Sequence, residues 1–159
     1  MIVRTARRAD AEAVAAIWNG EIREGVSTFT TTEKSATALE AEFAARGDAF
    51  VVAESGGEVV GFATYFQFRG GPGYAQTVEY TIHLAPSARG QGVGQQVLTE
   101  LEARARAAKM HVLVGGISGE NATGAAFHKK MGFVEVGRMP EVGQKFGRRM
   151  DLVLMQKLL

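Results

Sequence analysis

The stretch Arg89-Gly90-Gln91-Gly92-Val93-Gly94 decides how this sequence folds and what it binds. It lies between a predicted strand, Thr77 to Leu84, and a predicted helix that begins at Val93. The first N–H groups of a helix have no partner within the helix, and the helix dipole favours negative charge at that end. Glycines let the backbone approach a ligand closely. The segment therefore predicts an anion-binding loop, the alternative being a glycine-rich turn without a ligand.

Two common nucleotide-binding loops do not match this segment. A Walker loop ends in Gly-Lys followed by Ser or Thr, whereas this chain has Gly94-Gln95-Gln96. A dinucleotide-binding fingerprint needs a third glycine, which would fall at position 95, and it normally follows the first strand of a βαβ unit. Neither condition holds, so ATP, GTP and dinucleotides are disfavoured as ligands.

Hydrophobic periodicity predicts the elements on both sides of the loop. Strands are expected where β-branched and aromatic residues run between turn residues, and helices where apolar residues recur at i, i+3 and i+4. The predicted strands are one opening at Val3, then Ala49–Ser55, Val59–Phe68, Thr77–Leu84, His111–Ile117, Phe133–Gly137 and Arg149–Leu158. The predicted helices are one with Asp10 as N-cap, one that Gly47 ends, one from Val93 to about Ala108, and Thr123–Met131. The order is βααβββαβαββ, and without a linker or repeat it indicates one domain over residues 1–159.

The loop spacing Arg-x-x-Gly-x-Gly between a strand and a helix resembles the pyrophosphate loop of the GNAT acyltransferases, which holds the diphosphate of coenzyme A. Asn121 after the next strand and the run Phe127 to Phe133 extend the resemblance over the whole chain. Within GNAT, the segments 77–79, 82–84, 127–128 and 142–148 resemble phosphinothricin and methionine sulfone or sulfoximine acetyltransferases. The resemblance implies an α/β (α+β) GNAT fold, with a mixed, mostly antiparallel sheet of about seven strands flanked by helices.

The resemblance also implies where acetyl-CoA and the amine would bind. Backbone groups of Ile82, His83 and Leu84 would line the pantetheine arm, and Asn121 would contact the cofactor. The diphosphate would be held by Arg89, Gly90, Gln91, Gly92, Val93, Gly94 and Gln95. Pro72, Gly73 and Tyr74 would border the amine substrate. The chain departs from many relatives in having Arg149 where they have tryptophan, a difference that concerns the acceptor and not the reaction.

Glu79 is the leading candidate for a catalytic base. An amine near pH 7 enters as an ammonium ion and must lose a proton before it can attack a thioester, so the site needs a base, directly or through water. Glu79 is the only carboxylate in the predicted strand Thr77 to Leu84, which leads into the anion loop. The alternative is an outward-facing strand residue in a surface ion pair.

His128 is the candidate proton donor to the leaving thiolate. It lies two helical turns after Asn121, where many GNAT enzymes have a tyrosine that protonates the thiolate. An imidazole with a pKa near ~6.5 can serve the same end or relay a proton. The alternative is a half-buried helix histidine bonded to a backbone carbonyl.

The remaining side chains indicate little further chemistry. His83 and His111 have no convincing partner, and three scattered histidines lack metal-ligand spacing, so no metal is expected. The serines include no Gly-x-Ser-x-Gly turn, which disfavours an α/β-hydrolase with a serine nucleophile. The chain has no cysteine, which excludes a cysteine hydrolase. The basic residues Lys145, Arg148 and Arg149 could meet a substrate carboxylate, but a solvated strand end is the favoured interpretation.

Composition limits the partners of the protein. Lys and Arg total 18 against 17 Asp and Glu, a net charge of +1, so nucleic acid is not expected. The longest uncharged apolar stretch, Val59 to Phe68, is too short to span a bilayer. Charged residues near the N-terminus do not suit a secretory signal, so a cytoplasmic protein without membrane partners is expected. The sequence leaves the oligomeric state open, with a homodimer as the state considered.

The resemblance implies an N-acetyltransferase that moves an acetyl group directly from acetyl-CoA to the primary amine of a small amino acid analogue. The expected acceptors are of the phosphinothricin, methionine sulfone or methionine sulfoximine type. One alternative is a GNAT-like module that binds acyl-CoA without turnover, and the presence of both Glu79 and His128 argues against it. The other is acetylation of peptide N-termini, which needs an open groove and depends on the loop Arg69 to Tyr74.

Overall fold

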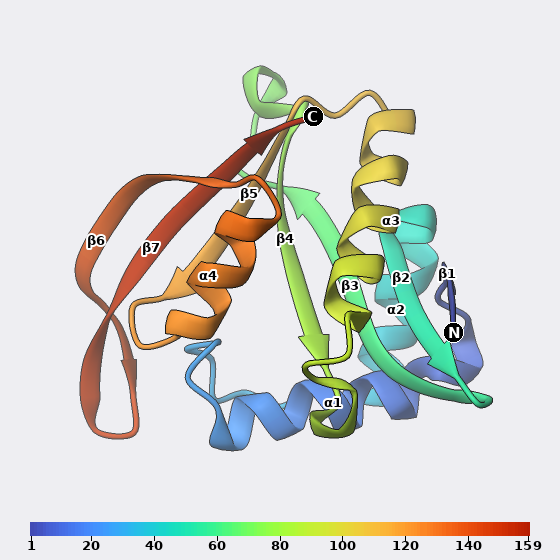
Figure 1. Ribbon diagram of the computed structural model, residues 1–159. Helices are drawn as coiled ribbons and strands as arrows, with labels where there is room; N and C mark the ends of the chain where they lie inside the picture. The colour runs from blue at the N-terminus through green and yellow to red at the C-terminus, as the bar shows by residue number, and fades with distance from the viewer.

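A seven-stranded sheet in the order β1-β2-β3-β4-β5-β7-β6 runs through the computed structural model, which describes residues 1–159 (Figure 1). The strands are β1 (Ile2–Thr5), β2 (Phe50–Ser55), β3 (Glu58–Gln67), β4 (Thr77–Leu84), β5 (Val112–Ser118), β6 (Val134–Lys145) and β7 (Arg148–Leu158). The helices are α1 (Ala11–Glu24), α2 (Ala36–Arg46), α3 (Val93–Ala107) and α4 (Ala122–Lys130). The predicted order βααβββαβαββ is confirmed.

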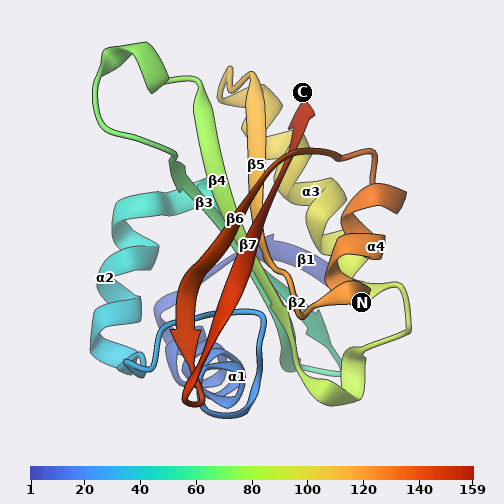
Figure 2. The ribbon, with the colours of Figure 1, turned by 90° about the vertical axis from the view of Figure 1, so that its left-hand side faces the viewer.

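The helices cover the sheet in two pairs, with α1 and α2 on one face and α3 and α4 on the other (Figure 2). Because side chains alternate along a strand, β4 contributes to both faces. Val78 and Tyr80 belong to the apolar core under α3, whereas the ring of His83 lies against Trp18 of α1. Glu79, which alternates with Val78 and Tyr80, therefore faces the α1 side.

The sheet divides between β4 and β5, which form its one parallel pair. Their pairing covers only Thr77–Tyr80 against Val112–Gly115. Beyond Tyr80, β4 continues to pair with β3 as far as Leu84, and β5 continues to pair with β7 as far as Ser118. The two strands therefore form a fork, and each leaves one backbone edge without a strand partner inside it.

Two local predictions need correction. Helix α1 does begin after Asp10, but the Asp10 carboxylate does not cap it, because it accepts the Arg7 N–H and forms an ion pair with Arg4. Strand β6 extends from Val134 to Lys145 instead of ending at Gly137. The strand accommodates Pro140 because β6 is at the sheet edge and has register shifts, one of them between Met139 and Gly143. No helix has the length and hydropathy that crossing a bilayer would require.

Candidate active site

A cavity of about 1140 Å³ opens at the fork between β4 and β5. Its walls come from the end of α1 and the segment after it, from β4 and β5, from the glycine loop before α3, and from α4. Most of the predicted site residues therefore share one cavity, although they come from widely separated parts of the chain.

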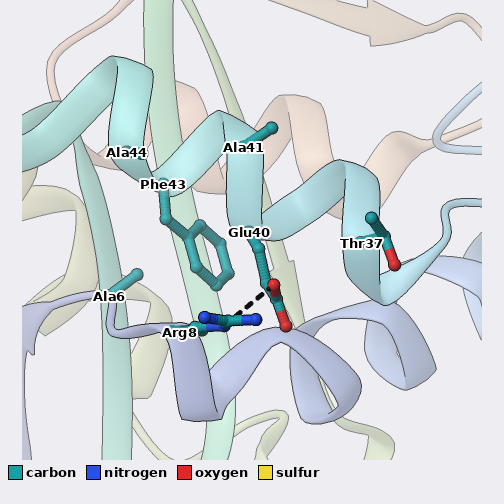
Figure 3. A pocket seen from close by; sticks show the side chains of 7 residues that line it. All are labelled: Ala6, Arg8, Thr37, Glu40, Ala41, Phe43 and Ala44. Atoms are coloured by element: carbon teal, nitrogen blue, oxygen red, sulfur yellow. Dashed lines mark ion pairs between the residues drawn. The ribbon is translucent and has the colours of Figure 1, made fainter.

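A second hollow of about 550 Å³ lies between the start of α1 and helix α2 (Figure 3). Its walls include small side chains such as Ala41 and Ala44, and Arg8 and Glu40 pair across it with an N–O distance of 3.0 Å. Because its two charged side chains already satisfy each other, we place the candidate site in the larger cavity.

The glycine loop has the geometry of an anion site. Gly90 and Gly92 have φ of +72° and +79°, a region that non-glycine residues adopt only at a cost. Gly92 is the N-cap of α3 and has no side chain to occupy the first amides of the helix, which leaves them available for a ligand. Arg89 is exposed beside the loop and adds positive charge, although it also approaches Glu21 at 3.4 Å.

The predicted donor-binding residues mostly line the cavity. Those that do are Ile82, His83, Leu84, Arg89, Gly90, Gly92, Gly94, Gln95 and Asn121. The side chain of Gln91 instead donates to the Ser87 carbonyl, and that of Val93 is buried in the core. These two residues can therefore serve a ligand only through their backbone.

His83 and Asn121 are held in defined states. Burial lowers the pKa of His83 to about 4, so its imidazole is neutral near pH 7. The Oδ1 atom of Asn121 accepts the Gly124 N–H at 2.9 Å and caps α4. This leaves the Nδ2 group of Asn121 as the part of its amide that can reach a ligand.

Glu79 lies in the cavity wall without a protein partner. Its carboxylate forms no ion pair or hydrogen bond, which excludes the surface ion pair considered as the alternative. Burial raises the pKa of Glu79 above its ordinary value. A Cβ atom at Gly116 would lie 3.6 Å from Glu79 Oε1, so the carboxylate stands beside β5 just past the last paired residues. A half-buried, unpaired carboxylate at this point can accept a proton from a ligand.

His128 is buried at the fork and both ring nitrogens have partners. Nδ1 lies 2.6 Å from the Gly124 carbonyl, and Nε2 is bonded to the Tyr80 hydroxyl. Since a carbonyl only accepts, Nδ1 carries the proton and Nε2 of the neutral ring accepts from Tyr80. Burial lowers the pKa of His128, which favours this neutral form. Gly115 makes room for the pair, because a Cβ atom there would lie 3.0 Å from His128 Nε2.

The two candidate catalytic side chains lie on opposite faces of the fork. Gly115 is next to His128 and Gly116 is next to Glu79, and consecutive residues of β5 point to opposite faces. A ligand between β4 and β5 would therefore have Glu79 on the α1 side and the Tyr80–His128 pair on the α4 side. Tyr80 also lines the cavity, and sequence reasoning missed it because only the fold brings its hydroxyl to His128.

Two segments considered near the acceptor, the turn 72–74 and the basic residues at 145–149, lie differently from what the sequence suggested. Pro72, Gly73 and Tyr74 form an exposed turn between β3 and β4, and they do not line the cavity. Arg149 is exposed and lies outside the cavity wall, so it neither narrows nor opens it. Lys145 is not a solvated residue, because its side chain is buried and its ammonium donates to backbone carbonyls after α1.

Comparison with known proteins gives consistent matches over the chain. The sequence model of the acetyltransferase (GNAT) family matches residues 13–133. A relative from Pseudomonas paraeruginosa, named L-methionine sulfoximine/L-methionine sulfone acetyltransferase, is 37% identical over 158 residues. That alignment covers 97% of this chain and 92% of the relative.

Two solved structures are similar over nearly the whole chain. One is described as a ribosomal-protein-alanine N-acetyltransferase from Brucella melitensis, with a TM-score of 0.95, 38% identity and complete coverage of both chains. The other is a GNAT superfamily phosphinothricin acetyltransferase from Sinorhizobium meliloti in complex with acetyl-CoA, with a TM-score of 0.94 and 32% identity. Its match covers 99% of this chain and 88% of the other.

Proposed function

Because the chain belongs to the acetyltransferase (GNAT) family, and is an enzyme that uses acetyl-CoA as its acetyl donor, we propose that its acceptor is a small amino acid. The acceptor class is the primary amine of an analogue such as methionine sulfoximine, methionine sulfone or phosphinothricin. The activities named for relatives at 32–37% identity support this class. The unpaired Glu79 carboxylate beside the fork supports an amine as the acceptor, since it can take up the proton that an ammonium must lose.

The cavity offers backbone and side-chain groups that suit each part of the donor. The free edges of β4 and β5 in the fork offer N–H and C=O groups to the amide-rich pantetheine arm, along Ile82 to Leu84. The left-handed turns at Gly90 and Gly92 and the open N-terminus of α3 suit the diphosphate. The Nδ2 group of Asn121 is a further donor from the α4 side. When bound, acetyl-CoA supplies an acetyl thioester that a neutral amine can attack.

Glu79 is the proposed base. Its carboxylate takes a proton from the ammonium of the acceptor, directly or through a water, so that the amine lone pair becomes nucleophilic. Partial burial raises the pKa of Glu79, which makes the carboxylate a stronger base than an exposed glutamate. Since Glu79 faces the α1 side, the proposed acceptor would bind on that side of the fork.

We propose that His128 acts on the thiol side together with Tyr80. In the resting structure the neutral imidazole has no free N–H, because Nδ1–H donates to Gly124 and Nε2 accepts from Tyr80. His128 therefore orients the Tyr80 hydroxyl at the end of the paired segment of β4 and β5, where it can turn to donate a hydrogen bond to a departing thiolate. The hydroxyl keeps its proton, because burial raises the pKa of Tyr80, and the thiol gains the second proton that the amine loses on becoming an amide. Tyr80 would therefore contact the sulfur of coenzyme A, and His128 would act as a positioning residue that holds the Tyr80 hydroxyl.

The experiment that tests the acceptor class compares initial rates of thiol release from acetyl-CoA. Methionine sulfone is expected to give faster release than a tripeptide with an N-terminal alanine. The name of the Brucella melitensis structure favours a peptide N-terminus as the second candidate acceptor, and a faster rate with the tripeptide would select it. A binding module without turnover would release no thiol with either amine.

We also propose that the protein forms a homodimer through the outer edge of β6. That strand is at the end of the sheet, with an unpaired backbone edge and exposed apolar side chains at Val134, Val136 and Val142. Such edges are normally covered, because they pair readily with another chain. Light scattering coupled to size exclusion chromatography tests this proposal. The wild type should be a dimer and Val136→Lys a monomer, and a monomeric wild type would contradict the proposal.

We also propose a cytoplasmic location, which fractionation of cells tests.

A further inference from the structure

The side chain of Lys145 occupies an unusual position for a lysine without a carboxylate partner. It is only 3% exposed, and its ammonium donates to the carbonyls of Gly25 at 2.6 Å, Thr28 at 2.9 Å and Glu21 at 3.3 Å. A buried ammonium needs its three protons satisfied, and here backbone oxygens alone do so. The bonds join the tip of the β6–β7 hairpin to the end of α1, two segments that lie side by side in Figures 1 and 2.

The carbonyls that Lys145 holds belong to one wall of the cavity. The segment Gly25–Thr30 follows α1, and each of its residues lines the cavity. Terminal carbonyls of a helix lack intrahelical partners, so a cation at this position also suits the end of α1. The segment approaches the fork from the α1 side, which is the side that Glu79 faces.

A second contact fixes the same segment to the same hairpin. The ring of Phe29 lies so close to Gly143 that a Cβ atom there would fall 2.5 Å from it. Gly143 is buried, and it has no left-handed φ that would by itself require glycine. The glycine is therefore explained by the room that Phe29 needs. The wall depends on the hairpin at two points, Lys145 and Gly143.

We propose that Lys145 is a positioning residue that sets acceptor selectivity, by holding Gly25–Thr30 as the acceptor-side wall. This inference rests on the proposed function, because it takes the Glu79 side of the fork as the place where the amine binds. The proposed donor-binding residues belong to other parts of the same cavity wall, namely the glycine loop, Ile82 to Leu84 and Asn121. Loss of the Lys145 bonds should therefore loosen the acceptor site and leave donor binding nearly unchanged.

The test compares Lys145→Met with Arg149→Met, which removes a positive charge from the same hairpin at an exposed position. Hydrogen bonds from a charged donor stabilise a segment more than neutral ones do. Losing one or two of them from Gly25–Thr30 should raise KM for methionine sulfone about 10- to 100-fold in Lys145→Met. The acetyl-CoA Kd should stay within about twofold, which a general loss of structure would not allow. Arg149→Met should behave as wild type in both measurements.

Hydrogen exchange adds a measurement that needs no acceptor. The Gly25 and Ser27 amides, which both bond to Glu21, should exchange faster in Lys145→Met and not in Arg149→Met. If no amine is acetylated, the proposed function fails, and exchange at these two amides still decides whether Lys145 holds the wall. Unchanged exchange would overturn the inference.

The kinetic outcomes are equally decisive. A Lys145→Met enzyme with wild-type KM for methionine sulfone, or one whose acetyl-CoA Kd rises by the same factor as KM, overturns the inference. If Lys145→Met does not fold, Gly143→Ala replaces it, because the added methyl displaces Phe29 without removing a charge. That variant should change the ratio of kcat/KM for methionine sulfone over glycine at least about tenfold, and an unchanged ratio counts against the inference.

Discussion

Replacing Gly92 by valine should weaken acetyl-CoA binding strongly while the protein still folds. Gly92 has φ of +79°, and a residue with a Cβ pays about 1–2 kcal/mol to adopt such a left-handed conformation. No protein atom lies within 4 Å of the Cβ position, so the cost is conformational and not a clash. Relief of that strain would turn the amides at the start of α3 away from the diphosphate. Loss of two charge-assisted hydrogen bonds costs about 3 to 6 kcal/mol, or about 10²- to 10⁴-fold in Kd.

Isothermal titration of acetyl-CoA into Gly92→Val measures this loss directly. Gly57→Val is the matched control, since Gly57 has φ of +84°, equally open space and a place in the β2–β3 turn outside the cavity. Both variants should lose similar thermal stability, but only Gly92→Val should lose affinity. A folded Gly92→Val protein that binds acetyl-CoA as tightly as wild type would refute the assignment of the loop.

Three further results are expected from the site. Glu79→Gln should lower kcat about 10²- to 10⁴-fold with little change in acetyl-CoA Kd. Because burial raises the pKa of Glu79, turnover should rise with pH above the usual glutamate range, and rates across pH 5 to 9 should show this limb in wild type but not in Glu79→Gln. Tyr80→Phe and His128→Ala should each slow transfer from acetyl-CoA more than transfer from p-nitrophenyl acetate, whose leaving group needs no proton; equal slowing with both donors would remove the pair from the thiol side. Since the pKa of His83 falls to about 4 on folding, the unfolded chain binds more protons between pH 6.5 and 4, and stability falls as pH drops through that window. His83→Gln should reduce that fall in urea titrations, and an identical pH dependence would argue against the buried neutral imidazole.

Much of the fold was predictable because its signals are local. The periodicity of the long helix from Val93 and the Gly56-Gly57 turn between two apolar strands depend on neighbours in sequence. The full length of β6 was not predictable, because Pro140 and the glycines around it usually end a strand. Only the edge position of β6 and its register shifts make that continuation acceptable.

The candidate site likewise contains residues that local sequence indicates and residues that only the fold brings together. Glu79 and the glycine loop are adjacent to elements that the sequence marks, so they could be proposed as a base and an anion site. The partners of His128 and Lys145 are distant in sequence, at Tyr80 and at Gly25–Thr28. No local pattern encodes those contacts. The turn Pro72–Tyr74 was expected at the substrate but lies outside the cavity wall. The Gln67 side chain donates to the Gly71 carbonyl within this loop, a contact that no local pattern indicates.

We propose that this enzyme acetylates small amino acids with Glu79 as the base. One competition experiment tests it most directly: wild-type enzyme with acetyl-CoA and an equimolar mixture of methionine sulfone, methionine sulfoximine, phosphinothricin, spermidine, an aminoglycoside and an N-terminal alanine peptide. Mass spectrometry then measures the initial rate of each acetylated product, with Glu79→Gln as the parallel sample. We expect an amino acid analogue to be acetylated fastest and its product nearly to disappear with Glu79→Gln. Faster acetylation of spermidine, the aminoglycoside or the peptide, or undiminished product from Glu79→Gln, would contradict it.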